Sequence, residues 1–449
     1  MIAAITRKLS DAGLSPSAAA RKADLFQSVE RVLDGSSEGR KADERLRWFV
    51  PGRIEVLGKH TDYAGGRSLL CCAERGFCVA ARPRGDRTVR IADTARSLEA
   101  SLLLEDDARG SDSGWTVYAA TVLRRVSRNF SGPLRGAEIA FASDLPRASG
   151  MSSSSALVVS LFLAISAVND LPARAEYARN VHGLDDLAGY LGAVENGYPF
   201  GTLSGDRGVG TFGGSEDHTA ILCCRAGRLS RYSFRPVRAE EVVPVPSDWI
   251  FVLADSGVAA DKTGNARERY NRASLSAAAV LDLWREATGR DDPTLAAAAS
   301  SSPAAPDRIR EILAEFRSPR FAPEVLRDRF DQFFEESEVI VPEASEAFRR
   351  GDAPALGPIV DRSQARAEAL LGNQIPETIA LARDARRFGA IAASAFGAGF
   401  GGSVWALVPR SDADSFCERW RAEYRAAFPE AAAASEFFTT DAGPGALAL

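Results

Sequence analysis

Four consecutive serines, Ser152–Ser155, end a turn-rich stretch that begins at Asp144, and the apolar run Ala156–Val168 follows them directly. The run predicts a buried helix, so the serines stand at its N-terminus. Backbone N–H groups there point outward with a positive partial charge, which suits a phosphate group. Serine hydroxyls add donors for phosphate or an oxygen ligand for Mg²⁺. A plain serine-rich helix cap is the alternative.

A second stretch, Gly397–Gly402, contains four glycines and lies between the strand-like runs Ile391–Ala393 and Val404–Val408. Glycine permits left-handed backbone and a close approach to a ligand or to another loop. A tight hairpin would use the same residues. Alone, the glycines are therefore weak evidence for nucleotide binding.

A turn that follows the strand-like run Ile54–Leu57 gathers four polar side chains, those of Lys59, His60, Asp62 and Tyr63. Together they offer several hydrogen-bond donors and acceptors to a polyhydroxylated ligand. An ordinary solvated turn is the alternative.

Two acidic residues flank a glycine-rich stretch at 197–214: Glu195 precedes it, and Asp217 follows it. The next residues, Thr219–Cys224, predict a short apolar strand. A carboxylate at the edge of such a strand can act as a base or hold a cation. An acidic loop without function is the alternative.

Composition limits the class of protein. The 449 residues suggest two or three domains, and 45% hydrophobic with 26% charged residues is typical of a folded globular protein. A net charge of -5 argues against a large nucleic-acid-binding surface. The six cysteines show no Cys-x-x-Cys spacing, which argues against structural zinc and suits a reducing compartment. No apolar run reaches the roughly 18 residues of a membrane span, so we expect a cytoplasmic protein.

The elements that must position these residues mix helices and strands without regular βαβ alternation, which predicts an α+β fold. A proline-containing segment near 236–247 is the expected domain boundary, giving domains 1–240 and 241–449. The last residues, Ala442–Leu449, are expected to form a loose tail.

Taken together and in order, the four stretches resemble the signatures of the GHMP kinase superfamily, and of galactokinases within it. Gly52–Tyr63 is similar to the N-terminal sugar signature, Pro146–Ser154 to the central phosphate loop, and Gly397–Gly402 to the C-terminal glycine string. The resemblance spans about residues 50–410.

The resemblance implies a two-domain α+β fold with the active site between the domains. The N-terminal half would be similar to ribosomal protein S5 domain 2, and the C-terminal half would be ferredoxin-like. It also implies an ATP- and Mg²⁺-dependent sugar kinase acting on the anomeric hydroxyl of galactose or a related monosaccharide. The implied partners are the sugar and ATP, without nucleic acid or membrane, in a monomer or weak homodimer.

By the same resemblance, Asp217 is the catalytic carboxylate and Arg53 its partner, and phosphoryl transfer relies chiefly on such positioning and electrostatics. His60, Asp62 and the backbone at Gly214 would bind sugar hydroxyls.

The resemblance also supplies the nucleotide and metal residues. Ser154 and Glu195 would hold Mg²⁺, and Trp115 would lie near the adenine. The ATP phosphates would lie against Gly150, Ser152, Ser153, Ser154 and Ser155.

Two departures bear on the substrate. Lys59 stands where galactokinases have glutamate, and lysine offers donors but no acceptor. A sugar with a C6 carboxylate, galacturonate, is therefore an alternative to a neutral hexose, unless Lys59 turns away to pair with an acid such as Glu55 or Glu216. Glu55 itself replaces the usual asparagine.

Two further questions stay open at this point. Either Arg267 or Tyr270 occupies the position of a sugar-contacting tyrosine. A non-catalytic sugar and ATP sensor on the same fold is the third reading of function, but it would be expected to lack some of the catalytic residues that this sequence retains.

Overall fold

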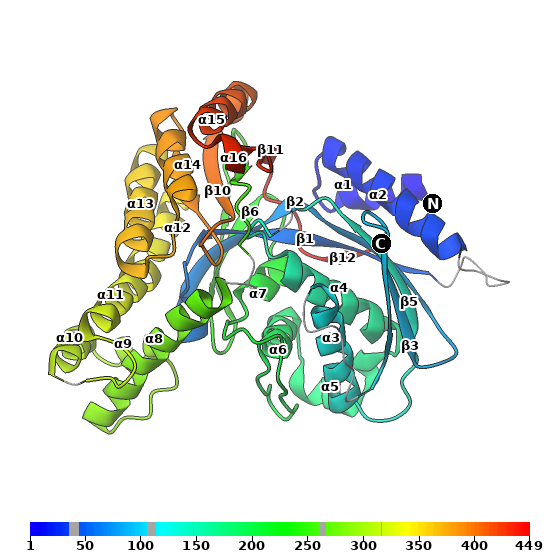
Figure 1. Cartoon of the computed structure of the whole chain (residues 1–449), viewed down its shortest axis with the longest axis horizontal. Helices are drawn as coiled ribbons and strands as arrows, with labels where there is room; N and C mark the ends of the chain where they lie inside the picture. The colour runs from blue at the N-terminus through cyan, green and yellow to red at the C-terminus, as the bar shows by residue number, and fades with distance from the viewer. Residues whose placement is uncertain (36–44, 106–113, 147, 261–265, 316) are drawn as a thin grey trace.

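Two β-sheets and the helices around them (Figure 1) form the part of the chain that the computed structural model describes, residues 1–35, 45–105, 114–146, 148–260, 266–315 and 317–449. The larger sheet contains β1 (Leu46–Leu57), β2 (Arg67–Pro83), β3 (Thr88–Asp93), β4 (Leu98–Leu103), β5 (Ala137–Ser143), β6 (Arg228–Ser233), β7 (Arg238–Pro244) and β12 (Leu447–Ala448). The smaller sheet contains β8 (Trp249–Asp255), β9 (Ala392–Ala395), β10 (Ser403–Pro409) and β11 (Glu436–Thr440).

The larger sheet has the order β12-β1-β2-β5-β3-β4, and β6 and β7 extend it from β2. Strands β3 and β5 are parallel, and the other pairs are antiparallel. The smaller sheet is antiparallel in the order β11-β8-β10-β9. The predicted α+β class is thus confirmed.

The α-helices are α1 (Ile2–Asp11), α2 (Pro16–Gly35), α3 (Thr116–Asn129), α4 (Ser153–Val168), α5 (Ala175–Asn180), α6 (Leu184–Asn196), α7 (Glu216–Cys223), α8 (Ala266–Thr288), α9 (Leu295–Ala299), α10 (Ala305–Glu315), α11 (Pro323–Phe334), α12 (Val341–Arg350), α13 (Ala353–Arg366), α14 (Pro376–Arg387), α15 (Ala413–Ala427) and α16 (Pro429–Ala432). Short 3₁₀ segments are η2 (Asp62–Ala64), η3 (Leu171–Ala173) and η6 (Arg410–Asp412), and π-helical segments are η4 (Glu335–Ile340) and η5 (Ala367–Leu371).

The larger sheet is covered on both faces. Helices α1 and α2 lie on one face, and α3, α4 and α6 lie on the other (Figure 1). Side chains alternate across β2 accordingly: Cys78 and Ala80 pack under α1 and α2, and Val79 and Ala81 join the core around α4. Burial on both faces explains why β2 reads as a nearly continuous apolar run.

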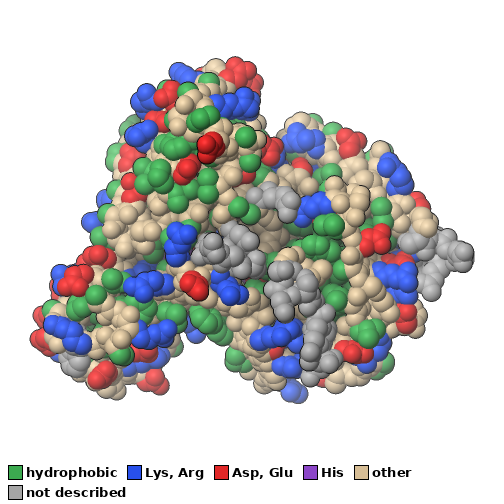
Figure 2. Space-filling model, viewed as in Figure 1, with side chains coloured by type: hydrophobic (Ala, Val, Ile, Leu, Met, Phe, Trp, Pro, Cys, Tyr) green, Lys and Arg blue, Asp and Glu red, His purple; other side chains and the backbone are tan. Residues whose placement is uncertain are grey.

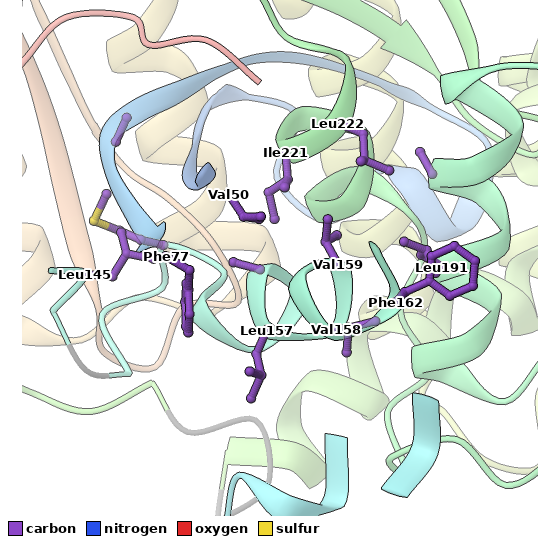
Figure 3. Close-up of a cluster of buried hydrophobic side chains, with 14 of the residues drawn as sticks. Val50, Phe77, Leu145, Leu157, Val158, Val159, Phe162, Leu191, Ile221 and Leu222 are labelled. Atoms are coloured by element: carbon purple, nitrogen blue, oxygen red, sulfur yellow. The ribbon is translucent and has the colours of Figure 1, made fainter. Parts of the chain in front are cut away.

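Helix α4 is apolar on all sides, and the buried helix predicted over Ala156–Val168 is confirmed. Val159 points toward Val50 and Ile221, whereas Leu157 leaves the helix on another side (Figure 3). A helix packed all round cannot rotate without losing these contacts. Its first turn, which carries the serines, is therefore fixed in place.

The smaller sheet separates two cores. Odd-numbered residues of β8 from Trp249 to Leu253 join the core of the larger sheet, and even-numbered residues from Ile250 to Ala254 pack with α14 and α15. This is the period of two expected of a strand buried on both faces. A third core joins α8, α10 and α11 and includes Tyr63 and Ala64 of η2, so these helices support the turn at residues 58–66.

Two local predictions were wrong. Residues 219–223 belong to helix α7 rather than to a strand, and Cys224 is the C-cap of that helix. Ile221 and Cys224 lie in different core clusters, so a short run buried all round had no period to reveal its type. Ala442–Leu449 is no loose tail, because β12 pairs with β1 in register Phe49 to Leu447 and covers the edge of that strand.

We propose that the two domains divide between β7 and β8. The predicted boundary at residues 240 and 241 falls inside β7, which still belongs to the larger sheet. The change of sheet follows at residues 245–248, and β12 later returns the chain to the larger sheet.

Basic and acidic side chains are interspersed over the described part of the face that Figure 2 presents, with no broad region of one sign. Within the described residues, no helix combines the length and the apolar character that crossing a membrane requires.

Deleting residues 443–449 should destabilise the protein. The deletion removes backbone N–H donors that reach carbonyls of β1, β2 and the α7 region, namely those of Gly443, Gly445, Ala446 and Leu449. At about 1 kcal/mol for each hydrogen bond, we expect a loss of several kcal/mol in urea unfolding. Deleting only the last two residues removes one of these donors and should lower the free energy of unfolding clearly less. Equal stability of the full chain and the longer deletion would contradict the role assigned to β12.

Candidate active site

Four segments that are far apart in the sequence meet around one cavity, which we call the central cavity. Its lining includes Arg53 from β1, Asp62 from η2, Ser155 from α4, Asp217 from α7 and Gly397 after β9. Both sheets thus contribute to it. The serine-rich turn and the acidic turn, which the sequence separates by about sixty residues, face the same space.

Arg53 and Asp217 form an ion pair in the cavity, with their Nη2 and Oδ1 atoms 2.6 Å apart. Nη1 of Arg53 donates to the carbonyl of Gly150 at 2.9 Å, which ties the pair to the phosphate loop. Burial alone would lower the pKa of Arg53, but Asp217, Glu216 and Glu55 outweigh it and raise that pKa. The guanidinium is therefore charged, and it faces the catalytic carboxylate predicted from the resemblance.

Ser155, rather than Ser154, faces the acidic residues. Its Oγ lies 2.9 Å from Oε2 of Glu195 and 3.2 Å from Oδ2 of Asp217. Nε2 of His218 lies 3.0 Å from the same Glu195 oxygen. Ser154 lines a neighbouring cavity instead, so the pairing of Ser154 with Glu195 is corrected to Ser155. Successive residues of a first helical turn point about 100° apart, so a shift of one residue changes the cavity that a side chain enters.

A hydroxyl and a carboxylate side by side form an oxygen donor set that fits Mg²⁺, which prefers oxygen ligands and keeps part of its water shell. Ser155 and Glu195 present such a set in the lining of the central cavity. They are our candidates for holding the ion.

The second cavity, the nucleotide cavity, lies on the other side of the serine turn. Gly150, Ser152, Ser153 and Ser154 line it, and Trp115 lies at its aromatic end, edge-on to Phe141. Ser152 Oγ is buried and has no hydrogen-bond partner within the described residues. A buried hydroxyl without a partner is costly unless a ligand completes it, and phosphate oxygens would do so. Residue 147 of this loop lies outside the described residues.

The glycine string packs against the phosphate loop. A Cβ on Gly397 would lie 2.8 Å from the carbonyl oxygen of Gly150, closer than such contacts occur. Ser403 Oγ donates to the carbonyl of Ser149 at 2.7 Å on the same side. The glycines therefore allow close backbone contact between the C-terminal and N-terminal halves.

The turn at residues 58–66 contributes to the wall of the central cavity, where His60 and Asp62 lie together with Gly214. Asp62 Oδ2 accepts the backbone N–H of Glu216 at 3.1 Å, and a Cβ on Gly214 would lie 2.3 Å from the same oxygen. Only glycine therefore fits at position 214.

His60 is held by two contacts that define its tautomer. Nε2 lies 3.1 Å from the carbonyl of Ala398, which can only accept, so Nε2 carries the proton. Nδ1 then accepts from the Tyr63 hydroxyl at 3.0 Å. Burial raises the pKa of Tyr63 to about 12, which keeps this hydroxyl protonated.

The structure separates the two candidates for the sugar-contacting tyrosine. Tyr270 lines the central cavity, with its ring centre 5.3 Å from that of His60. Arg267 is exposed, does not line the cavity and lies near Gly210. Tyr270 is thus the residue in contact with the candidate sugar site.

Lys59, predicted to bind substrate, does not line the central cavity. Its side chain is 1% exposed, and Nζ donates to Ser363 Oγ at 2.8 Å. Ser363 donates in turn to Oε1 of Glu336, which also accepts the backbone N–H groups of Gly58 and Lys59. Lys59 has therefore turned toward an acid, but the acid is Glu336 of η4 rather than Glu55 or Glu216.

One residue that the sequence reading passed over organises the wall of the cavity. Asn196, at the end of α6, accepts from the Thr211 hydroxyl at 2.8 Å and from the Gly213 N–H at 2.7 Å, and donates to the Gly214 carbonyl at 3.0 Å. In the sequence, the position of Asn196 directly after Glu195 was the signal that could have identified it.

Three family models match this chain. Residues 116–193 match the GHMP kinases N terminal domain, residues 344–426 match GHMP kinases C terminal, and residues 37–83 match the galactokinase galactose-binding signature.

Similar curated proteins are galactokinases. That of Roseiflexus sp. (strain RS-1) is 29% identical over 82% of this chain and 84% of its own length. That of Chloroflexus aggregans is 30% identical over 54% of this chain and 56% of its own length.

Solved structures share the fold. Lactococcus lactis galactokinase, crystallised with galactose, gives a TM-score of 0.75 at 21% identity and covers 94% of this chain and 99% of its own. The mevalonate kinase of Methanococcus jannaschii gives a TM-score of 0.52 at 12% identity and covers 90% of this chain and 99% of its own. With the paired Arg53 and Asp217 beside a serine-rich helix start, these matches lead to one conclusion: the chain belongs to the GHMP kinase superfamily and is a galactokinase-like sugar kinase.

Proposed function

We propose that this kinase transfers the γ-phosphate of ATP to the anomeric hydroxyl of a neutral hexose of the galactose class. The observation that carries the proposal is the buried ion pair of Arg53 and Asp217, because it joins the central cavity to the phosphate loop through Gly150. The similar Lactococcus structure is a galactokinase in complex with galactose, which supports a substrate of the galactose class.

In this proposal the nucleotide cavity takes ATP, with the base at Trp115 and the phosphates along the serine turn. Ser155 and Glu195 hold Mg²⁺, which when bound offsets charge on the phosphate oxygens. Asp217 accepts or orients the sugar hydroxyl proton. Arg53 opposes the negative charge that develops between the hydroxyl oxygen and the γ-phosphate.

The charge of the central cavity favours a neutral sugar over a uronic acid. Its lining contains a single guanidinium within the described residues, and the carboxyl groups outnumber it: Glu55, Asp62, Glu195, Glu216 and Asp217. Lys59, the residue that suggested galacturonate, is engaged outside the cavity by Ser363. A sugar carboxylate would meet like charge, without a free cation to pair with among the described lining residues.

Catalysis is favoured over a non-catalytic sensor because the catalytic pair and the polar residues of both cavities are assembled.

The six cysteines are all free, which suits the cytoplasmic location that we propose. A monomer or weak homodimer remains part of the proposal.

Replacing Asp217 by asparagine should lower kcat at least about a hundredfold, because the amide cannot accept the proton. ADP release with galactose as acceptor measures the rate. Unchanged far-UV circular dichroism and ATP binding would show that the fold survives. Near-normal turnover would remove Asp217 from the mechanism.

Galactose should be used with a kcat/KM at least about tenfold above that of galacturonate, which corresponds to a difference of about 1.4 kcal/mol. D-fucose is the matched control, because it lacks the 6-oxygen but is neutral, and separates charge from a lost hydrogen bond. Equal or better use of galacturonate would contradict the charge argument.

Ser155→Ala should raise the Mg²⁺ concentration for half-maximal activity at least about tenfold, the size seen when groups at metal sites are lost. Ser154→Ala, the neighbouring control, should leave that requirement nearly unchanged and act instead on the KM for ATP. The reverse order of effects would return the metal role to Ser154.

A further inference from the structure

Two buried carboxyl groups meet beside the catalytic arginine. Glu55 and Glu216 are 3% and 5% exposed, and Oε1 of Glu55 is buried without a hydrogen-bond partner within the described residues. Oε2 of Glu55 lies 3.7 Å from Arg53 Nη2, and Oε1 of Glu216 lies 3.5 Å from Arg53 Nε. The second oxygen of Glu216 accepts the Ser68 hydroxyl at 2.6 Å, and Oε2 of Glu55 accepts the Gly397 N–H at 3.3 Å.

Two ionised carboxylates beside the same guanidinium, both away from water, would repel strongly. One proton held by the pair removes that repulsion, because a protonated carboxyl can donate to an ionised one. The pair then titrates as a unit.

The proton belongs on Glu216. Burial, and then the nearby charge of Glu55, raise the pKa of Glu216 well above its ordinary value. Burial also raises the pKa of Glu55, but the cations of Arg53 and Lys59 act in the opposite direction there. The charged and titratable groups that face the pair are those of Arg53, Lys59, Asp62, Tyr63, Asp217 and Glu336.

We infer that Glu55 and Glu216 hold one proton between them and that neutral Glu216 is a positioning residue for the transfer. While Glu216 is neutral, Arg53 keeps its hydrogen-bonding contacts on Asp217 and on the Gly150 carbonyl. Once Glu216 ionises, a third full negative charge competes for the guanidinium at Nε, which has no hydrogen bond of its own within the described residues. The catalytic part of this inference rests on the proposed function, but the proton on the pair does not.

The sign of the pH effect follows. A carboxyl whose pKa is higher in the folded than in the unfolded protein takes up a proton on folding. Stability is therefore lost as pH rises from the unfolded value, about 4.3 for glutamate, through the folded value. Glu216→Gln copies the protonated acid, because its amide can donate to Glu55 and its carbonyl can accept from Ser68.

The stability test compares the urea unfolding of wild type and Glu216→Gln from about pH 5 to about pH 8. We expect the variant to gain stability relative to wild type as pH rises. Glu74→Gln is the matched control, since Glu74 is equally buried but accepts backbone N–H groups outside both cavities, and it should show no such gain. A stability difference for Glu216→Gln that stays constant with pH would overturn the inference.

A measurement on the wild-type protein covers the case in which the variant does not fold. Infrared spectra at about pH 8 should contain the carbonyl band of a protonated carboxylic acid, because an ordinary glutamate with a pKa of about 4.3 is ionised there. Burial raises the pKa of Asp255 to about 6, so at pH 8 that carboxyl no longer contributes. Glu55→Gln removes the neighbouring negative charge, so its band should disappear at a lower pH than that of wild type. A wild-type spectrum without the band would overturn the inference.

The activity test separates the two proposals. The ratio of kcat for Glu216→Gln to kcat for wild type should rise at least about threefold from about pH 6 to about pH 9, since only the wild type can lose the proton. A flat ratio would reject the positioning role. Absence of sugar phosphorylation in wild type, with the infrared band and the pH-dependent stability present, would reject the proposed function and leave the proton pair standing.

Discussion

The Arg53 guanidinium is a cation buried at 3% exposure, and such a charge is tolerated only where oppositely charged or polar groups surround it. Two of those groups come from places far apart in the chain, and the third is a near neighbour of Arg53. Asp217 is in α7, Gly150 precedes α4, and Glu55 is on the same strand as Arg53. The fold must bring them together, and the architecture can be understood as the means of doing so.

Two features of the fold bring these groups together around Arg53. Helix α4 is packed on every side, which fixes the serine turn at its start. The glycine string lets the C-terminal half approach the phosphate loop at backbone distance. Polar side chains of the cavity wall are in turn held by partners, as Asn196 holds the Thr211 hydroxyl and the Gly214 carbonyl. This is the rigidity that phosphoryl transfer requires, since the reaction relies on positioning more than on covalent chemistry.

Sequence reasoning reached the class of fold, the buried helix and the convergence of the four segments, because each depends on local pattern or on motifs with a physical role. It failed where the answer depended on long-range packing. Helix α7 is short and buried all round, so no periodicity marked it. Sequence reasoning placed Ser154 beside Glu195, whereas the structure places Ser155 there, one residue further along the first turn of α4. The partner of Lys59 lies 277 residues away in η4, beyond any local signal.

Lys59 and Glu55 are best understood together, although the sequence presents them as two separate departures from the galactokinase pattern. A lysine buried at 1% exposure needs negative charge nearby, and Glu336, reached through Ser363, and Glu55 supply it. Glu55 in turn needs cations, which Arg53 and Lys59 provide. The two substitutions therefore compensate each other electrostatically. Because Lys59 is held outside the cavity, its charge acts through Glu55 and not on the sugar, and a change of charge in the signature does not by itself imply a change of substrate.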